Sequence, residues 1–106
     1  MKYHVITIGG KELKCRLRTQ DIMDLEKKLG GQNVLKVIMD DQIPSLTVTL
    51  ATLHASLQAL EHGYTMEKVT ELYDEYVEEG KTYTDLMPEL INVLEASGFF
   101  KKPPTK

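Results

Sequence analysis

The sequence SLTVTLATLHASLQALE, residues 45–61, decides the fold. Its leucines recur at steps of four and three, and at about 100° per residue this spacing places them on one face of an α-helix over residues 46–61. These leucines are Leu46, Leu50, Leu53, Leu57 and Leu60. The opposite face carries small apolar side chains, which are Val48, Ala51, Ala55 and Ala59. Ser45 is the expected N-cap, and Gly63 is the expected end.

Two opposed apolar faces indicate a helix that lies between two layers. We expect the leucines to face the main core and the small face to meet a closely approaching neighbour. That neighbour is either another helix of the same chain or a partner protein, so Val48, Ala51, Ala55 and Ala59 are candidates for self-association. Polar residues form the two flanks of the helix, with Thr47, His54, Gln58 and Glu61 on one and Thr49, Thr52 and Ser56 on the other.

Residues 3–18 predict an antiparallel β-hairpin. The segment YHVITI is rich in β-branched residues, and Gly9 with Gly10 suits a tight turn with positive φ. The second strand alternates, with a buried face at Leu13, Cys15 and Leu17 and a wet face at Lys14, Arg16 and Arg18. Cys15 is therefore interpreted as a small core residue and not as a nucleophile.

Capping signals bound four further helices. The expected N-caps are Thr19, Asn33, Thr65 and Thr82, the last in a capping box with Asp85. The helix after Thr65 has an acidic outer face and an apolar face at Val69, Leu72, Tyr73, Tyr76 and Val77. Phe99 and Phe100 are expected to fold back on the core after Ser97 and Gly98.

The predicted fold class is α+β and mainly helical: the N-terminal hairpin is followed by about five helices packed around the central helix 46–61. Residues 1–100 are expected to form a single compact domain, with the hairpin at 3–18 and the helical body at 20–100. The tail 101–106 has no apolar side chain to anchor it and is predicted to be disordered.

Charge is distributed unevenly along the chain, whose net charge is −3. Residues 1–36 carry eight Lys or Arg against four Asp or Glu, residues 37–100 carry two against twelve, and residues 101–106 carry three lysines and no acid. This pattern fits either ordinary solvated faces or attraction between copies and docking on a basic partner. The acidic body argues against nucleic-acid binding, because that depends on neutralising phosphates.

No set of residues predicts chemistry. His54 and His62 are eight residues apart, which puts them two turns and roughly 80° apart on a helix, too far to share a metal ion without outside ligands. We expect no catalytic, metal or cofactor site. The first residues lack the apolar core of a signal peptide, and no run approaches the roughly 20 apolar residues of a membrane span. We therefore expect a cytosolic protein that makes no membrane contact.

Two segments resemble one family. KCRLRTQDIMDLEKKLGG, residues 14–31, is similar to the N-terminal signature of the tail assembly chaperones of long-tailed, siphovirus-type bacteriophages. The stretch from Thr65 through YDEYVEEGKTYTDLMPELINVLEASGFF resembles the C-terminal half of those from phages and prophages of Gram-positive bacteria. Each motif is weak alone, whereas their combination, order and spacing carry the resemblance.

The resemblance implies a non-enzymatic role in the cytoplasm of a bacterial host. Such chaperones bind the long helical tape-measure protein and keep it soluble during tail assembly. Further partners that the resemblance implies are the tail-tube protein and a frameshifted longer form of the chain. A second copy in a homo-oligomer is suggested by the small face of the helix and by the opposed charges. The alternative is a structural tail or head–tail completion protein that is retained in the virion.

A helical client would bind as a helix in a groove. We place this groove beside the short second helix and expect it to use Met23, Val37 and Met39, because methionines at helix edges adapt to varied partners. The alternative is that all three side chains belong to the core.

Overall fold

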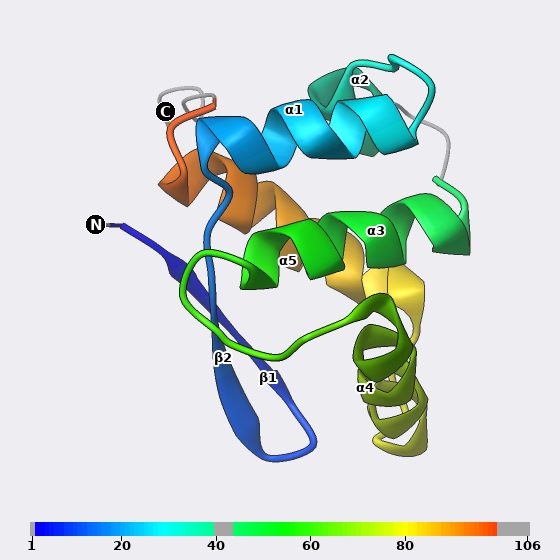
Figure 1. Cartoon of the computed structure of the whole chain (residues 1–106). Helices are drawn as coiled ribbons and strands as arrows, with labels where there is room; N and C mark the ends of the chain where they lie inside the picture. Colours follow the sequence, from blue (N-terminus) through cyan, green and yellow to red (C-terminus); the bar gives the residue numbers. More distant parts are fainter. Residues whose placement is uncertain (1, 40–43, 100–106) are drawn as a thin grey trace, which may run out of the picture.

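The computed structural model describes residues 2–39 and 44–99 and shows a hairpin followed by five helices (Figure 1). The predicted α+β, mainly helical class is confirmed. The elements are β1 (His4–Ile8), β2 (Lys11–Cys15), α1 (Thr19–Lys28), α2 (Val34–Met39), α3 (Leu46–Leu57), α4 (Met66–Glu78) and α5 (Tyr83–Ala96). The predicted disordered tail 101–106 and Phe100 lie outside the described residues.

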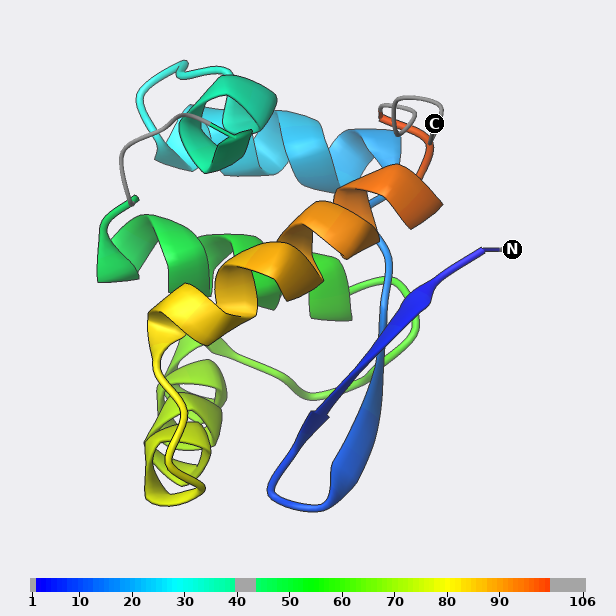
Figure 2. The same ribbon diagram turned by 180° about the vertical axis from the view of Figure 1, so that it is seen from behind.

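Helix α3 lies at the centre of the molecule. Figures 1 and 2 show α1 and α2 above it, the hairpin and α4 below it, and α5 crossing behind it in Figure 1, and α3 contacts α1, α4, α5 and β2. Leu50 is 5 % exposed, and Leu53 and Leu57 are fully buried. The prediction that this helix lies between two layers agrees with this arrangement.

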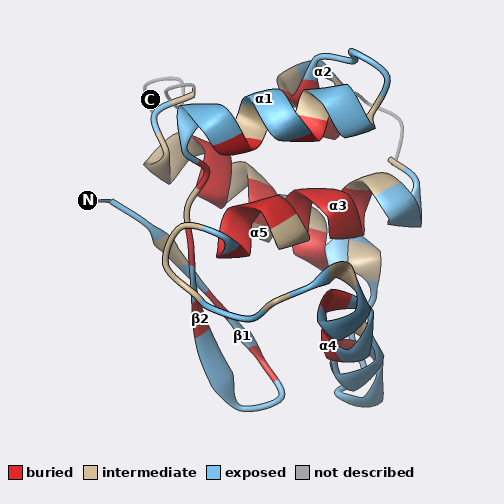
Figure 3. Cartoon of the chain, viewed as in Figure 1, coloured by how far each residue is buried: buried red, intermediate tan, exposed pale blue. Residues whose placement is uncertain are grey.

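One flank of α3 that the sequence indicated as polar belongs to the core (Figure 3). Thr49, Thr52 and Ser56 have no exposed surface. Their hydroxyl groups donate to carbonyl oxygens one turn back in the same helix, from Thr49 Oγ1 to Ser45 O at 3.0 Å, from Thr52 Oγ1 to Val48 O at 2.9 Å and from Ser56 Oγ to Leu53 O at 2.7 Å. Because each hydroxyl is satisfied within the helix, this flank can be buried without an unpaired donor.

The ends of α3 differ from the prediction. Leu46 in the first turn is 40 % exposed and not in the core. The helix ends at Leu57, with Gln58 as its C-cap, and does not continue to Gly63. The backbone N–H of Arg16 donates to Ser56 O at 2.9 Å, so the strand segment takes a carbonyl that another helical turn would use. Ala59 and Leu60 consequently lie in a turn and are half-buried.

The hairpin is antiparallel, with Ile6 opposite Leu13 and Ile8 opposite Lys11. Gly9 and Gly10 form its turn with φ of 60° and 76°, a region in which glycine is free of steric strain. The expected buried face is confirmed: Leu13 is 2 % exposed, and Cys15 and Leu17 are fully buried.

The helix N-termini follow the capping signals with one exception. Asn33, Thr65 and Thr82 act in the expected places. The exception is α1, whose N-cap is Arg18 and whose first helical residue is Thr19. Asp21 decides this boundary, because its carboxylate accepts from the backbone N–H of Arg18 at 2.9 Å and from the guanidinium at 2.8 and 3.0 Å.

Val77 and Phe99 are both predicted to contact the core, and the structure places only Phe99 against it. Val77 was assigned to the apolar face of α4, yet it is 47 % exposed, because it lies at the edge of that face in the last turn of the helix. Phe99 packs against the core as expected.

Candidate partner-binding surfaces

The three residues predicted to bind a partner lie on α1 and α2. Met23 is 52 % exposed, so the alternative that it belongs to the core is wrong. Met23 is three residues before Glu26, whose carboxylate accepts from Val34 N at 3.2 Å, so Met23 lies roughly 60° around α1 from the side chain that contacts the start of α2. Val37, one turn after Val34, is half-buried. Met39 ends α2, and its side chain lies outside the described part of the structure.

A groove of about 420 Å³ lies between α1 and α3. We call it the α1–α3 groove; its lining residues are Asp21, Asp24, Leu25, Lys27, Lys28, His54, Ala55 and Gln58. Leu25 and Ala55 are buried and form an apolar floor, whereas Asp24, Lys27 and Lys28 are exposed along the rim. This volume is within the range of sites that accept small ligands or a few side chains.

The groove also shows what meets the small face of α3. Ala51 is 9 % exposed and Ala55 is 8 % exposed, and α1 is the helix packed nearest to Ala55. The neighbour of this face is thus a helix of the same chain, one of the two alternatives that the sequence left open. Self-association stays a prediction, and among the four stripe residues only Val48 and Ala59 are half-exposed.

The groove contains one residue with a perturbed pKa. Burial beside α1 lowers the pKa of His54 below its usual 6.5, and the positive charge of Lys28 lowers it further. His54 is consequently neutral at physiological pH. The neutral imidazole of His54 therefore adds no charge to the groove wall. The charges at the groove lie on its rim, where Asp24 is negative and Lys27 and Lys28 are positive.

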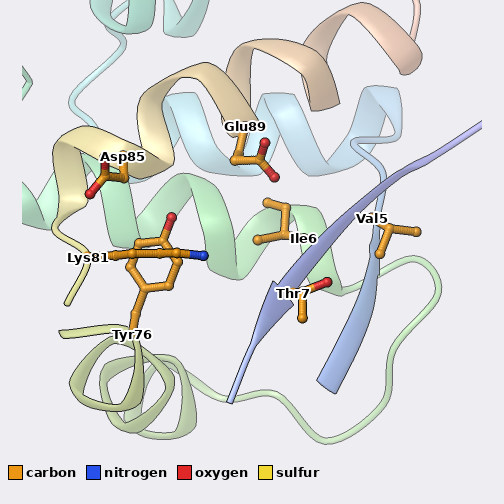
Figure 4. Close-up of a pocket in the computed structure, with 7 residues that line it drawn as sticks. All are labelled: Val5, Ile6, Thr7, Tyr76, Lys81, Asp85 and Glu89. Atoms are coloured by element: carbon orange, nitrogen blue, oxygen red, sulfur yellow. The ribbon is translucent and has the colours of Figure 1, made fainter. Parts of the chain in front are cut away.

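A second hollow of about 340 Å³ lies beside β1 (Figure 4). Its lining residues come from β1, from the end of α4 and from the start of α5: Val5, Ile6, Thr7, Tyr76, Lys81, Asp85 and Glu89. We call it the β1 pocket. Lys81 Nζ lies 5.3 Å from the centroid of the Tyr76 ring, and His4 Nε2 lies 3.2 Å from Glu89 Oε2.

The β1 pocket has a negative electrostatic potential at its inner wall. Burial raises the pKa of Tyr76 to about 12, and the negative charges of Asp85, Glu89 and Glu79 raise it in the same direction. Three carboxylates therefore disfavour ionisation of the Tyr76 hydroxyl group. Among the residues that line the pocket, Lys81 is the only lysine or arginine. No sequence pattern predicted this site, because its residues come from three segments far apart in the chain.

The cysteine and the possible metal ligands form no reactive or metal-binding site in the described part of the chain. Cys15 is fully buried, and burial raises the pKa of its thiol to about 11, so the thiol is protonated at neutral pH. Within residues 2–39 and 44–99, no group of three or more His, Cys, Asp or Glu side chains is arranged to hold a metal ion. None of the helices in these ranges is long and apolar enough to cross a membrane.

Comparison with known proteins places the chain in a family. Neither the curated proteins nor the solved structures include a significant match to this chain. A family model does match, over residues 2–106, which is almost the whole sequence. The chain belongs to the family described as a family of unknown function, DUF6096.

Proposed function

We propose that this protein is a phage or prophage tail assembly chaperone that binds the tape-measure protein and keeps it soluble in the host cytoplasm. The resemblance of residues 14–31 and 65–100 to such chaperones supports the identity of the client. The α1–α3 groove is the observation that carries the proposed binding mode, since an apolar floor with a charged rim suits an amphipathic helix.

In this proposal the client helix lies along α1. One or two of its apolar side chains enter the groove above Leu25 and Ala55, while its polar side contacts Lys27 and Lys28 on the rim. Met23 does not line the groove; it offers the client a further, adaptable apolar contact on the exposed side of α1. Binding of this kind needs no catalytic group.

Co-expression tests the proposal. The chain is expressed with the tape-measure protein encoded in the same genome, and the soluble fraction is subjected to a pull-down. We expect the long chain to be soluble and to co-purify only when this protein is present. A long chain that is insoluble in both cases, or soluble without help, contradicts the proposal. Detection of the protein in purified virions would instead favour the structural alternative.

Two variants locate the binding surface. Met23→Glu adds a charge at an exposed position, and Ala55→Leu fills the groove from its floor. Val77→Glu is the matched control, because Val77 is also an exposed apolar residue but lies on α4. We expect the first two variants to lose the client and the control to retain it, with thermal unfolding showing that all three are folded.

A further inference from the structure

The two outer edges of the hairpin differ in their hydrogen bonds to the rest of the chain. On β2, the backbone N–H of Lys14 donates to Glu61 Oε2 at 2.9 Å, and just beyond the strand the N–H of Arg16 donates to Ser56 O at 2.9 Å. The end of α3 and the segment that follows it therefore cover this edge at Lys14 and just beyond the strand. The outer edge of β1 faces the β1 pocket instead (Figure 4).

The register shows which backbone groups of β1 point outward. Val5 is opposite Lys14, whose N–H points away from β1 toward Glu61, so this pair is a non-hydrogen-bonded pair of the ladder. The pair of Thr7 and Glu12 lies two residues further along the ladder and is therefore also a non-hydrogen-bonded pair. The N–H and C=O groups of Val5 and Thr7 thus point to the open edge, and among the described residues none of these four groups has a hydrogen-bond partner.

The surroundings of this edge favour one extended chain as its occupant. Val5 is 38 % exposed, and Thr7 is exposed as well. Helices α4 and α5 contact β1; α4 stands beside the hairpin in both views (Figures 1 and 2), and α5 runs above the hairpin in Figure 2. A second folded copy that paired through β1 would bring its own α4 and α5 to this edge, whereas an extended segment brings only a single strand.

The charges around the edge specify the chemistry of that chain. Asp85 and Glu89 line the pocket, and Glu79 accepts from Gly9 N at 3.2 Å at the turn end of β1. The carboxyl group of Glu75 also lies against Gly9. Lys81 is the one lysine among the residues that line the pocket, and its ammonium group is held over the Tyr76 ring. Glu89 also contacts His4 Nε2 at 3.2 Å, and Glu75 lines a neighbouring hollow with Lys11 and Lys68, so Asp85 and Glu89 are the carboxylates nearest the edge.

We infer that the open edge of β1 is a strand-addition site for an extended peptide segment that carries lysine or arginine on one of its two faces. The backbone of the segment pairs with Val5 and Thr7, and its basic side chains point toward Asp85 and Glu89. The site is separate from the α1–α3 groove and does not depend on the identity of the client proposed above.

The probe is the acetylated and amidated peptide Lys-Val-Thr-Val-Lys-Val-Thr at about 1 mM, a concentration suited to weak peptide affinities. Amide hydrogen exchange is measured by NMR on the full chain. In the free protein the amides of Val5 and Thr7 should exchange faster than those of Ile6 and Ile8. With the peptide bound, we expect their exchange to slow by about tenfold or more.

Proline variants separate strand addition from other modes of binding. Val5→Pro removes an outward N–H without removing a bond to β2, and it should abolish the protection of Thr7. The matched control, Glu12→Pro, removes an outward N–H from the other strand and should leave peptide binding within about twofold of that of the natural sequence. Thermal unfolding verifies that both variants are folded; if Val5→Pro is not, N-methylation of alternate peptide amides replaces it.

Charge is tested separately. Glu89→Gln should weaken the lysine peptide by about three- to tenfold, and replacing both lysines of the peptide by glutamates should weaken it further. Absence of binding at this concentration overturns the inference, and so does binding that leaves Val5 and Thr7 unprotected or that is equally tight for the acidic peptide. Concentration-dependent protection of these amides without any peptide would identify a second copy as the occupant and would also overturn it.

Discussion

Helices α3 and α1 lie side by side, but the fold uses them in different ways. In α3 every side of the helix beyond its first turn has buried residues: Leu50, Leu53 and Leu57, then Ala51 and Ala55, then Thr49, Thr52 and Ser56. In α1 only one side is buried, at Asp21 and Leu25, and Met23 on the other side is 52 % exposed. The comparison teaches that the leucine-rich helix at the centre offers a partner little surface, chiefly His54 and Ala55 at the α1–α3 groove, because the rest of the chain covers most of it.

The largest expected effect on stability is the difference between a buried residue of α3 and an exposed residue of α1. Leu53→Ala removes a fully buried side chain from α3 and should lower the free energy of unfolding by about 2–5 kcal/mol. Met23→Ala on α1 should change it by less than about 0.5 kcal/mol. Urea unfolding followed by circular dichroism measures both values. Similar losses in the two variants would contradict the assignment of α3 as the centre.

The next effect concerns the beginning of α1. Asp21→Ala removes the carboxylate that accepts three hydrogen bonds from Arg18 and should cost about 1–2 kcal/mol of stability. Asp24→Ala is the matched control in the same helix, since Asp24 is exposed and accepts only from Gln20. Urea unfolding of the two variants compares them, and an equal loss would show that Asp21 is an ordinary surface residue.

A smaller effect tests the buried hydroxyl flank of α3. Thr52→Val replaces a hydroxyl that donates only to its own helix by a methyl group of similar size, so stability should change by less than about 1 kcal/mol in either direction. A loss of more than about 2 kcal/mol, measured in the same urea titration, would indicate that the hydroxyl has another, indispensable partner.

The smallest expected effect is the pH dependence of stability that comes from His54, which lies between α1 and α3. Because the folded protein holds the pKa of His54 below 6.5, the unfolded chain binds its proton more tightly, and stability falls as the pH drops below about 6.5. His54→Gln should make the thermal midpoint less sensitive to pH between about 6.5 and 5. Lys28→Gln should raise the pKa of His54, as measured by NMR titration. An unchanged pKa would contradict the role of Lys28.

Much of the fold follows from local signals. The hairpin register follows from Gly9 and Gly10 with the alternation around Leu13, and most helix starts follow from single capping residues. The end of α3 could not be predicted in this way, because a backbone bond from Arg16, forty residues earlier in the sequence, decides it. The burial of Thr52 depends likewise on which elements surround the helix.

The candidate sites were predictable only in part. Met23 is predicted to bind a partner in a groove beside the second helix; its exposure excludes the core alternative, and the binding itself stays a prediction. The α1–α3 groove was not foreseen, since Leu25 and Ala55 each looked like ordinary packing residues until the two helices were placed beside each other. The open edge of β1 could not be recognised either, because a sequence predicts a hairpin without showing which of its edges the helices will cover.

The most direct test of the account compares the two helices in the presence of the client. Soluble tape-measure protein that co-purifies with the chain is quantified for the natural sequence and for Met23→Glu, Ala55→Leu and Val77→Glu, all of them verified as folded. The account predicts loss of the client with the first two variants and full recovery with the third. Recovery of the client by all variants, or its solubility in the absence of the chain, would contradict the account.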